Sequence, residues 1–174
     1  MRTSLLCLGM LLTGLLTLSF QTQPVPLTDA QKAAISDSAT AVIREFFRKE
    51  QELSTDWINL YSTASDARYA EDGILSSALD SLRADSESSV ALLESSTIVV
   101  DALDVVVLGP EAAAVMAPYH FTLKTKAGNA TKGRAVFSAV VQRRANRWQI
   151  IHSHESHANI ARIMRELFPP KPKQ

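Results

Sequence analysis

Three of the four histidines in this 174-residue chain fall in one stretch, RWQIIHSHESH, which runs from Arg147 to His157. An imidazole changes charge near neutral pH, which suits proton transfer, and it is also a common metal ligand. His152 and His154 have the His-x-His spacing that can place two imidazoles on one ion. The stretch therefore raises three hypotheses: a catalytic base, a metal site, or the polar end of a strand.

The period of a β-strand predicts which way these histidines point. Alternate residues of a strand share a face, so one face is predicted to carry Trp148, Ile150, His152, His154 and Ser156. This face changes from apolar to polar along the strand, as expected where the base of a strand is core and its tip enters a pocket. We therefore expect His152 and His154 to face a cavity and His157 to point away from it.

A metal site would need a third protein ligand. His120 is the obvious candidate, but Tyr119 and Phe121 belong to the apolar face of its strand, so His120 is predicted to point outward. Asp66 or Asp72 would have to serve instead. We expect no metal and no cofactor.

The first residues have the layout of a secretory signal peptide. MRTS supplies a positive charge, an apolar run without acids follows, and the polar segment QTQPVP comes next. We predict a signal peptide over residues 1–20, or an uncleaved anchor, followed by a linker over 21–27. Cleavage would remove the only cysteine, Cys7, so the exported domain would have no disulfide. The expected location is periplasmic or secreted, without membrane contact after signal removal.

The charge balance gives no support for a nucleic-acid partner. Lys and Arg together number 18, equal to Asp and Glu, and no basic stripe is present. No nucleophile motif of the serine-elbow type occurs either. We expect a small-molecule partner.

The remaining chain predicts an α+β domain over residues 28–168, with a tail over 169–174. Thr28 caps a long amphipathic helix that ends near Glu52. A short helix around WINLYS, a hairpin at Asp72-Gly73 and a helix in ALDSLRADSESSVALLES follow. Four long strands complete the chain, the first over STIVVDALDVVVLG. This order predicts N-terminal helices packed on a strongly curved antiparallel sheet, with a pocket at its open end.

Three segments of the chain resemble the NTF2-like superfamily, in particular its SnoaL-like and DUF4440-type members. They are WINLYS, VVVLGPEAAAV and KGRAVFSAVVQRRANRWQIIHSHES, and the likeness spans roughly residues 32–158. It implies a cone-shaped α+β fold with a pocket, often dimeric through the outer sheet face. It implies no single activity, because the superfamily holds isomerases, dehydratases, cyclases and binding domains.

The positions of the acidic residues in the sequence give little support for an enzyme. Relatives similar to ketosteroid isomerases use an inward carboxylate with a phenol donor. The chain offers phenols, but Asp101 and Asp104 fall on opposite strand faces, and no acid matches the position of that base. The catalytic residues are therefore unknown, with His152 and His154 as candidates.

The sequence thus predicts an exported binding or accessory protein with a small-molecule pocket. The alternative is a small lyase, isomerase or hydrolase that uses a pocket histidine as general base, and a third possibility is a structural dimer with a filled cone. The predicted pocket residues are Trp57, Tyr61, Tyr69, Tyr119, Arg134, Trp148, His152, His154 and Ser156. Arg134 would meet an anionic ligand inside the cone or pair with an acid on the rim.

The strand AVFSAVV is apolar on both faces, with Phe137 on one and Val136 and Val140 on the other. Its inner face would meet the long helix, and its apolar outer face is expected to be buried as well. A symmetric sheet-to-sheet homodimer would bury that face.

Overall fold

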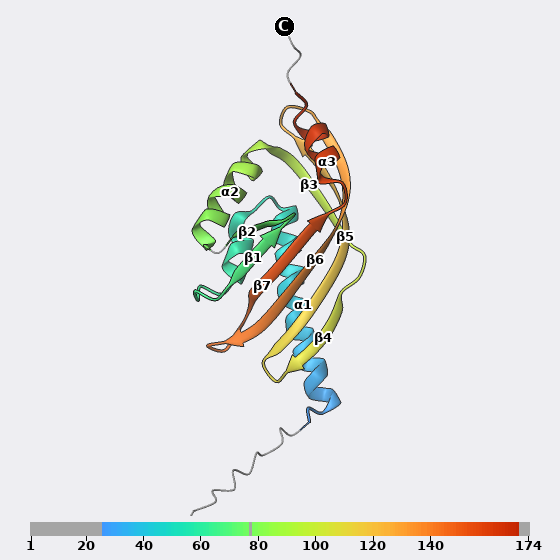
Figure 1. Cartoon of the computed structure of the whole chain (residues 1–174). Coiled ribbons are helices and arrows are strands. Elements are labelled where there is room, and N and C mark those ends of the chain that lie inside the picture. The colour runs from blue at the N-terminus through green and yellow to red at the C-terminus, as the bar shows by residue number, and fades with distance from the viewer. Residues whose placement is uncertain (1–25, 77, 171–174) are drawn as a thin grey trace, which may run out of the picture.

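The computed structural model describes residues 26–76 and 78–170, and it folds into helices packed on one curved sheet (Figure 1). The predicted leader over 1–20, most of the linker over 21–27 and residues 171–174 of the tail lie outside the described residues. In chain order the elements are α1 (Asp29–Gln51), the 3-10 helix η1 (Thr55–Leu60), β1 (Arg68–Glu71), β2 (Ile74–Ser76), α2 (Leu79–Leu92), β3 (Leu93–Val100), β4 (Asp104–Gly109), β5 (Ala112–Thr125), β6 (Ala130–Arg144), β7 (Arg147–His157) and α3 (Ile160–Leu167). Among the helices that the structure describes, none is both long enough and apolar enough to pass through a membrane.

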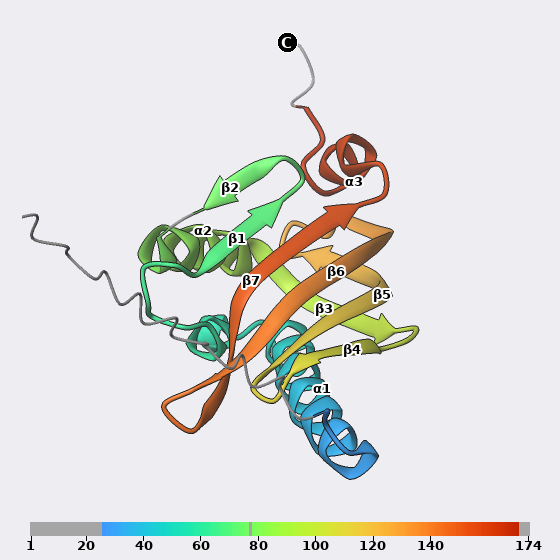
Figure 2. The same ribbon diagram turned by 60° about the horizontal axis from the view of Figure 1, so that its bottom comes forward.

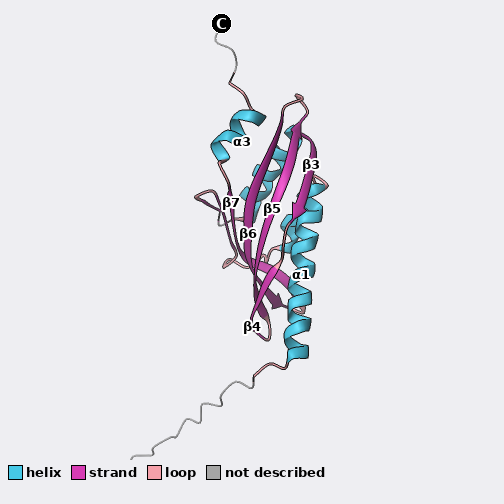
Figure 3. Cartoon of the chain, turned by 90° about the vertical axis from the view of Figure 1, so that its right-hand side faces the viewer, coloured by secondary structure: helices cyan, strands magenta, loops and turns pink. Residues whose placement is uncertain are grey.

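The helix α1 begins and packs as its sequence predicts. The Thr28 side chain accepts a hydrogen bond from the backbone of Gln31, whose own side chain bonds back to the backbone of Thr28, which completes a capping box. Its buried residues are Ile35, Ala39, Ile43, Phe46 and Phe47, which form one face at helical spacing. This face lies along the inner surface of the sheet (Figure 3).

The sheet is mostly antiparallel, in the order β2-β1-β7-β6-β5-β3, and β4 also pairs with β5. The expectation of a wholly antiparallel sheet is wrong at one edge, because β1 runs parallel to β7. The chain reaches this edge from η1. Tyr61 forms a parallel bridge with Ile150, and the amide of Ser62 donates to the carbonyl of Ile150 at 2.9 Å. These contacts set β1 in the same direction as β7 (Figure 2).

The predicted first long strand is divided into β3 and β4, which both pair with β5. The interruption lies opposite Pro118, whose carbonyl accepts from the amide of Asp101 at 2.9 Å. Proline has no N–H to donate in return. The missing donor explains why the ladder stops here and resumes at Asp104.

A β-bulge in β7 decides where the polar residues of that strand point. Val141 of β6 lies opposite Ile150, whereas the next residue towards the start of β6, Val140, lies opposite His152. Ile151 is therefore an extra residue without a partner on β6. A bulge of this kind moves every following side chain to the other face of the sheet.

Candidate functional site

The bulge reverses the predicted orientation of the histidine cluster. His152, His154 and Ser156 are exposed on the outer face of the sheet, so the prediction that they line a pocket is wrong. Ser153 and Glu155 are instead buried on the inner face, where they are 0% and 4% exposed. His157, which was predicted to point away, lines the inner cavity.

The cavity has a volume of about 270 Å³ and lies between α2, the C-terminal end of α1, η1 and the inner face of the sheet. Its wall has aromatic, aliphatic and carboxylate side chains, together with His157 and four serines. Aromatic rings come from Trp57, Tyr69, Tyr119 and Phe121; aliphatic groups come from Leu53, Leu82, Val90, Leu93, Ile98 and Leu123; and carboxylates come from Glu50, Glu71, Asp85 and Glu155. A largely apolar cavity with a few convergent polar groups is the usual form of a small-molecule site.

Glu155 is the most deeply buried of these acids. The Tyr119 hydroxyl donates a hydrogen bond to Glu155 Oε1. The pKa of Glu155 is raised to about 7, chiefly by burial and also by the charges of Glu71 and Asp72, while the hydrogen bond from Tyr119 and the nearby His157 act to lower it. A carboxyl group with this pKa can both hold and release a proton near neutral pH.

Two further carboxylates stand beside it. Burial, together with the charges of Glu155 and Glu71, raises the pKa of Glu50 well above its usual value. Glu71 accepts a hydrogen bond from the Tyr69 hydroxyl at 2.7 Å. Burial also raises the pKa values of Tyr69 and Tyr119, so both phenols stay neutral and act as donors.

His157 and Asp72 form a dyad at the rim of the cavity. His157 Nδ1 lies 2.9 Å from Asp72 Oδ2, and the backbone amide of His157 donates to Asp72 Oδ1 at 2.8 Å. Asp72 occupies the tight turn between β1 and β2 with φ of 46°, which presents its carboxylate to the end of β7. Because Nδ1 meets a carboxylate, Nε2 is the nitrogen left to exchange a proton with a ligand.

Three of these groups could also hold a metal ion. Ligand atoms of Glu71, Glu155 and His157 all lie within 4.8 Å of one another. Each already has a second partner: Tyr69, Tyr119 and Asp72 respectively. Such outer partners orient metal ligands and also orient catalytic groups, so the arrangement suits either role.

Some of the other predicted pocket residues line the cavity, and some lie outside it. Trp57, Tyr69 and Tyr119 line the cavity. Tyr61 lies behind its wall, where its hydroxyl is 2.5 Å from Ser153 Oγ. Trp148 is half-buried and is not part of the cavity wall.

Arg134 is exposed in a shallow groove on the outer face, next to His120, and does not enter the cone. His120 points outward as predicted and pairs with Asp101 at 2.9 Å. Of the two aspartates weighed as ligands, Asp66 pairs with Arg144 at 2.6 Å and Asp72 meets His157.

Sequence reasoning missed Glu50, Glu71 and Glu155, and with them the inward carboxylate that it sought. Glu50 carried a readable signal, because it follows Phe46 and Phe47 at helical spacing on the buried face of α1. Glu71 precedes the predicted hairpin turn. Glu155 could be placed inside only with knowledge of the bulge.

A family model described as the calcium/calmodulin dependent protein kinase II association domain matches residues 94–159, which extend from β3 to just beyond β7. No curated protein matches the sequence. Many solved structures do resemble the fold.

One similar structure is an NTF2-like superfamily protein from Salmonella enterica, with a TM-score of 0.65 and 16% identity, covering 72% of this chain and 92% of that one. A candidate scytalone dehydratase from Novosphingobium aromaticivorans has a TM-score of 0.66 and 7% identity, covering 75% and 89%. A candidate calcium/calmodulin dependent protein kinase II association domain from Xanthomonas campestris has a TM-score of 0.53 and 20% identity, covering 78% and 91%. With α1 across a curved sheet and a pocket at its open end, the chain therefore has the predicted NTF2-like α+β fold.

Proposed function

We propose that this protein is an exported binding or accessory domain that holds a small molecule in the cavity beneath α2. The buried carboxylate of Glu155 carries this proposal, because an ionised carboxylate out of water costs several kcal/mol unless it is well paired. Among residues 26–76 and 78–170, a hydrogen bond reaches only Oε1 of Glu155. Its Oε2 is not sealed in protein, since no unpaired polar atom of these residues is fully enclosed. A ligand in the cavity is the natural partner for this oxygen.

A bulky side chain inside the cavity tests the proposal. Ser96 lines the cavity on β3, whereas its neighbour Ser95 is exposed. Ser96→Phe should displace the ligand, and Ser95→Phe is the matched control. Native mass spectrometry of protein purified from its own host should find a small molecule on the wild type and the control, and not on Ser96→Phe. A wild-type protein that carries no ligand and binds none from a fragment library would contradict the proposal.

A proton-transfer enzyme is the second candidate, a small lyase, isomerase or hydrolase with a pocket histidine as base. The His157–Asp72 dyad favours it, and the histidine is then His157 rather than His152 or His154. A carboxylate that orients an imidazole is a common device in acid–base catalysis. The similar structure of a candidate scytalone dehydratase is consistent with enzyme chemistry on this fold.

The enzyme candidate separates from simple binding once the ligand is known. Wild-type protein should then convert the ligand, while His157→Gln should bind it and leave it unchanged. Recovery of unaltered ligand from wild-type protein after long incubation would rule out this candidate and leave the binding role intact.

We also propose that two copies pair through the outer sheet face. Val106, Leu108 and Met116 are 61%, 57% and 52% exposed there, which suits an interface better than bulk water. Met116→Glu should convert the dimer to a monomer in sedimentation velocity, whereas Ser88→Glu on the exposed side of α2 should not. A wild-type monomer at all concentrations would contradict the pairing.

Two finer assignments rest on the sequence. Export depends on the signal-like residues 1–20, and mass determination of the host protein would reveal whether they are removed. Membership of the SnoaL-like or DUF4440-type group depends on the quoted motifs, and the association-domain match at residues 94–159 is the competing assignment.

A further inference from the structure

We propose that the ligand of this cavity is a small organic cation, an amine with an apolar body. This inference rests on the proposed binding function and narrows its ligand class. It follows from the charges, the unpaired oxygens and the rings that meet around this one cavity.

The charges of the cavity wall have one sign. Four carboxylates line it, and the only basic side chain among its described lining residues is His157, which is already paired with Asp72. The nearest arginine and lysine on α1, Arg48 and Lys49, turn to Glu45 instead. A concave site lined by one sign of charge concentrates ions of the opposite sign.

Two of these carboxylates lack enough donors. Among the described residues, Glu50 receives no side-chain hydrogen bond, and Glu155 receives one, on Oε1. Burial raises the pKa values of both groups, and the charge of Glu71 adds to the rise in each. An ammonium group supplies several N–H donors and one positive charge, so it would satisfy both carboxylates at once.

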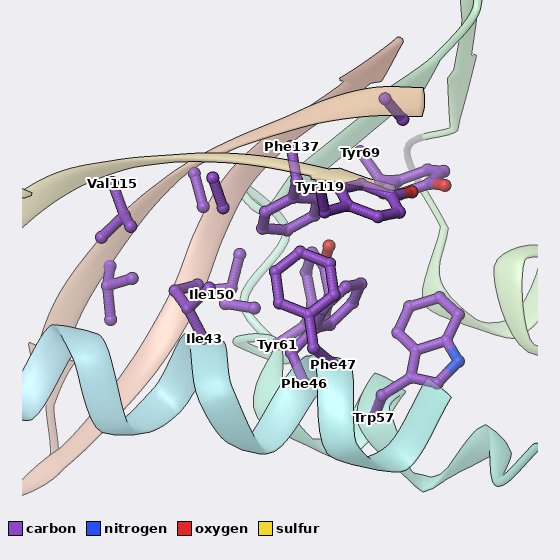
Figure 4. Close-up of a cluster of buried hydrophobic side chains, with 14 of the residues drawn as sticks. Ile43, Phe46, Phe47, Trp57, Tyr61, Tyr69, Val115, Tyr119, Phe137 and Ile150 are labelled. Carbon is purple, nitrogen blue, oxygen red and sulfur yellow. The ribbon is translucent and has the colours of Figure 1, made fainter. Parts of the chain in front are cut away.

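The aromatic residues of the wall favour the same ligand. Trp57 and Tyr69 have ring centroids 6.4 Å apart, and Tyr119 and Phe121 have centroids 6.0 Å apart. Figure 4 shows Trp57 rising from the helical layer towards Tyr69 and Tyr119 of the sheet. Ring faces attract ammonium groups within about 6 Å of their centroids.

A bare metal ion would use only one corner of this space. Glu71, Glu155 and His157 could bind it, but six aliphatic side chains line the rest of the cavity. Aliphatic side chains supply no ligand atom to an ion, whereas they remove the apolar body of an organic ligand from water, which favours binding. An anionic ligand would face four carboxylates without a lysine or arginine among the described lining residues.

Probes that share an apolar body and carry different charges test the inference. Benzylamine, benzyl alcohol and benzoate form one set, and choline with its neutral carbon isostere forms another. Titration calorimetry should be run above pH 7, the value to which the pKa of Glu155 is raised. We expect each cation to bind at least about tenfold more tightly than its neutral partner, because its positive charge is attracted to the carboxylates and ring faces of the wall, and the ammonium of benzylamine also donates charge-assisted hydrogen bonds.

Three substitutions test which carboxylates are responsible for the preference for the cation. Glu155→Gln keeps the acceptor for Tyr119 and removes the charge, so it should abolish the preference for the cation. Glu50→Gln should reduce it and serves as the second test if the first variant folds poorly. Glu87→Gln, on the exposed side of α2, should leave the preference unchanged.

The possible outcomes separate this inference from the broader proposal. Equal binding of cation and alcohol, blocked by Ser96→Phe, would overturn the charge preference and keep the binding function. Stoichiometric binding of Zn²⁺ or Mg²⁺ alone that excludes every amine would also overturn it. Failure of all probes, together with an empty cavity in host-purified protein, would overturn both.

Discussion

The two ends of the layer between α1 and the sheet are built differently. At the closed end, α1 packs on the sheet mainly through apolar side chains: Ile43, Phe46, Val115, Phe137 and Ile150 are each 2% exposed or less. Phe46 stacks on Phe137 with ring centroids 4.6 Å apart. At the open end, the same helix and sheet supply Glu50 and Glu155 to the cavity.

The strand β7 contributes to both ends, and its bulge lies between the two contributions. Ile150, before the bulge, belongs to the closed core, and Glu155, after it, belongs to the cavity. A strand that buries a carboxylate where an apolar side chain would fit gives up stability there. Such local costs are typical of functional sites in otherwise consistent folds. The closed end is therefore expected to stabilise the fold, and the open end to hold the ligand.

Removal of a closed-end ring should have the largest effect. Phe137→Ala would leave a cavity against Phe46, with an expected loss of about 3–5 kcal/mol in the free energy of unfolding. Chemical denaturation gives this value. The control is Val136→Ala on the outer face, which should cost far less because Val136 is 39% exposed. Similar losses for both variants would mean that the closed end is not the main source of stability.

Removal of the Glu155 charge at the open end should instead raise the free energy of unfolding. Folding raises the pKa of Glu155 from 4.5 to about 7, so the folded state binds the extra proton between these values and its stability falls as the pH rises through them. Above pH 7 the cost reaches on the order of 3 kcal/mol. Glu155→Gln should therefore be more stable than wild type above pH 7, and the difference should vanish below pH 4.5.

Denaturation curves across this pH range measure the effect. The groups that face Glu155 and also shape the curve are Glu50, Glu71, Asp72, His157 and the Tyr119 hydroxyl. Glu87→Gln, exposed on α2, should follow the wild-type curve at every pH. If Glu155→Gln is less stable than wild type above pH 7, the carboxylate contributes to stability and the contrast between the two ends fails.

A single methyl group tests how closely the floor of the cavity is packed. A Cβ at Gly133 would lie 2.2 Å from Cζ of Phe121, so Gly133→Ala must displace that ring. Overpacking of this kind costs about 1–3 kcal/mol, and the shifted ring should also weaken ligand binding. Gly109→Ala is the control, since nothing lies within 4 Å of its Cβ position. Equal melting temperatures for the two variants would show that Phe121 moves aside freely.

Much of the fold could be read from the sequence because its signals are local. The capping box at Thr28, the apolar face of α1 and the Asp72-Gly73 turn each depend on residues a few positions apart. The bulge in β7 differs, because it lies next to Ile150, which forms a bridge with Tyr61 and accepts a hydrogen bond from Ser62, some ninety residues earlier. Nothing within RWQIIHSHESH indicates that contact. Strict alternation was the natural assumption, and it placed the wrong residues inside.

The variants with the smallest expected effect test whether His152 and His154 lie outside the cavity. His152→Ala and His154→Ala remove exposed side chains on the outer face, so each should change the free energy of unfolding by no more than about 0.5 kcal/mol. The bond from Ser138 Oγ to the backbone carbonyl of His154 survives the change. Both variants should keep the ligand found by native mass spectrometry, whereas His157→Ala, which breaks the pair with Asp72, should weaken its retention. Loss of the ligand in His152→Ala or His154→Ala, with His157→Ala unaffected, would mean that alternation without the bulge describes the working protein.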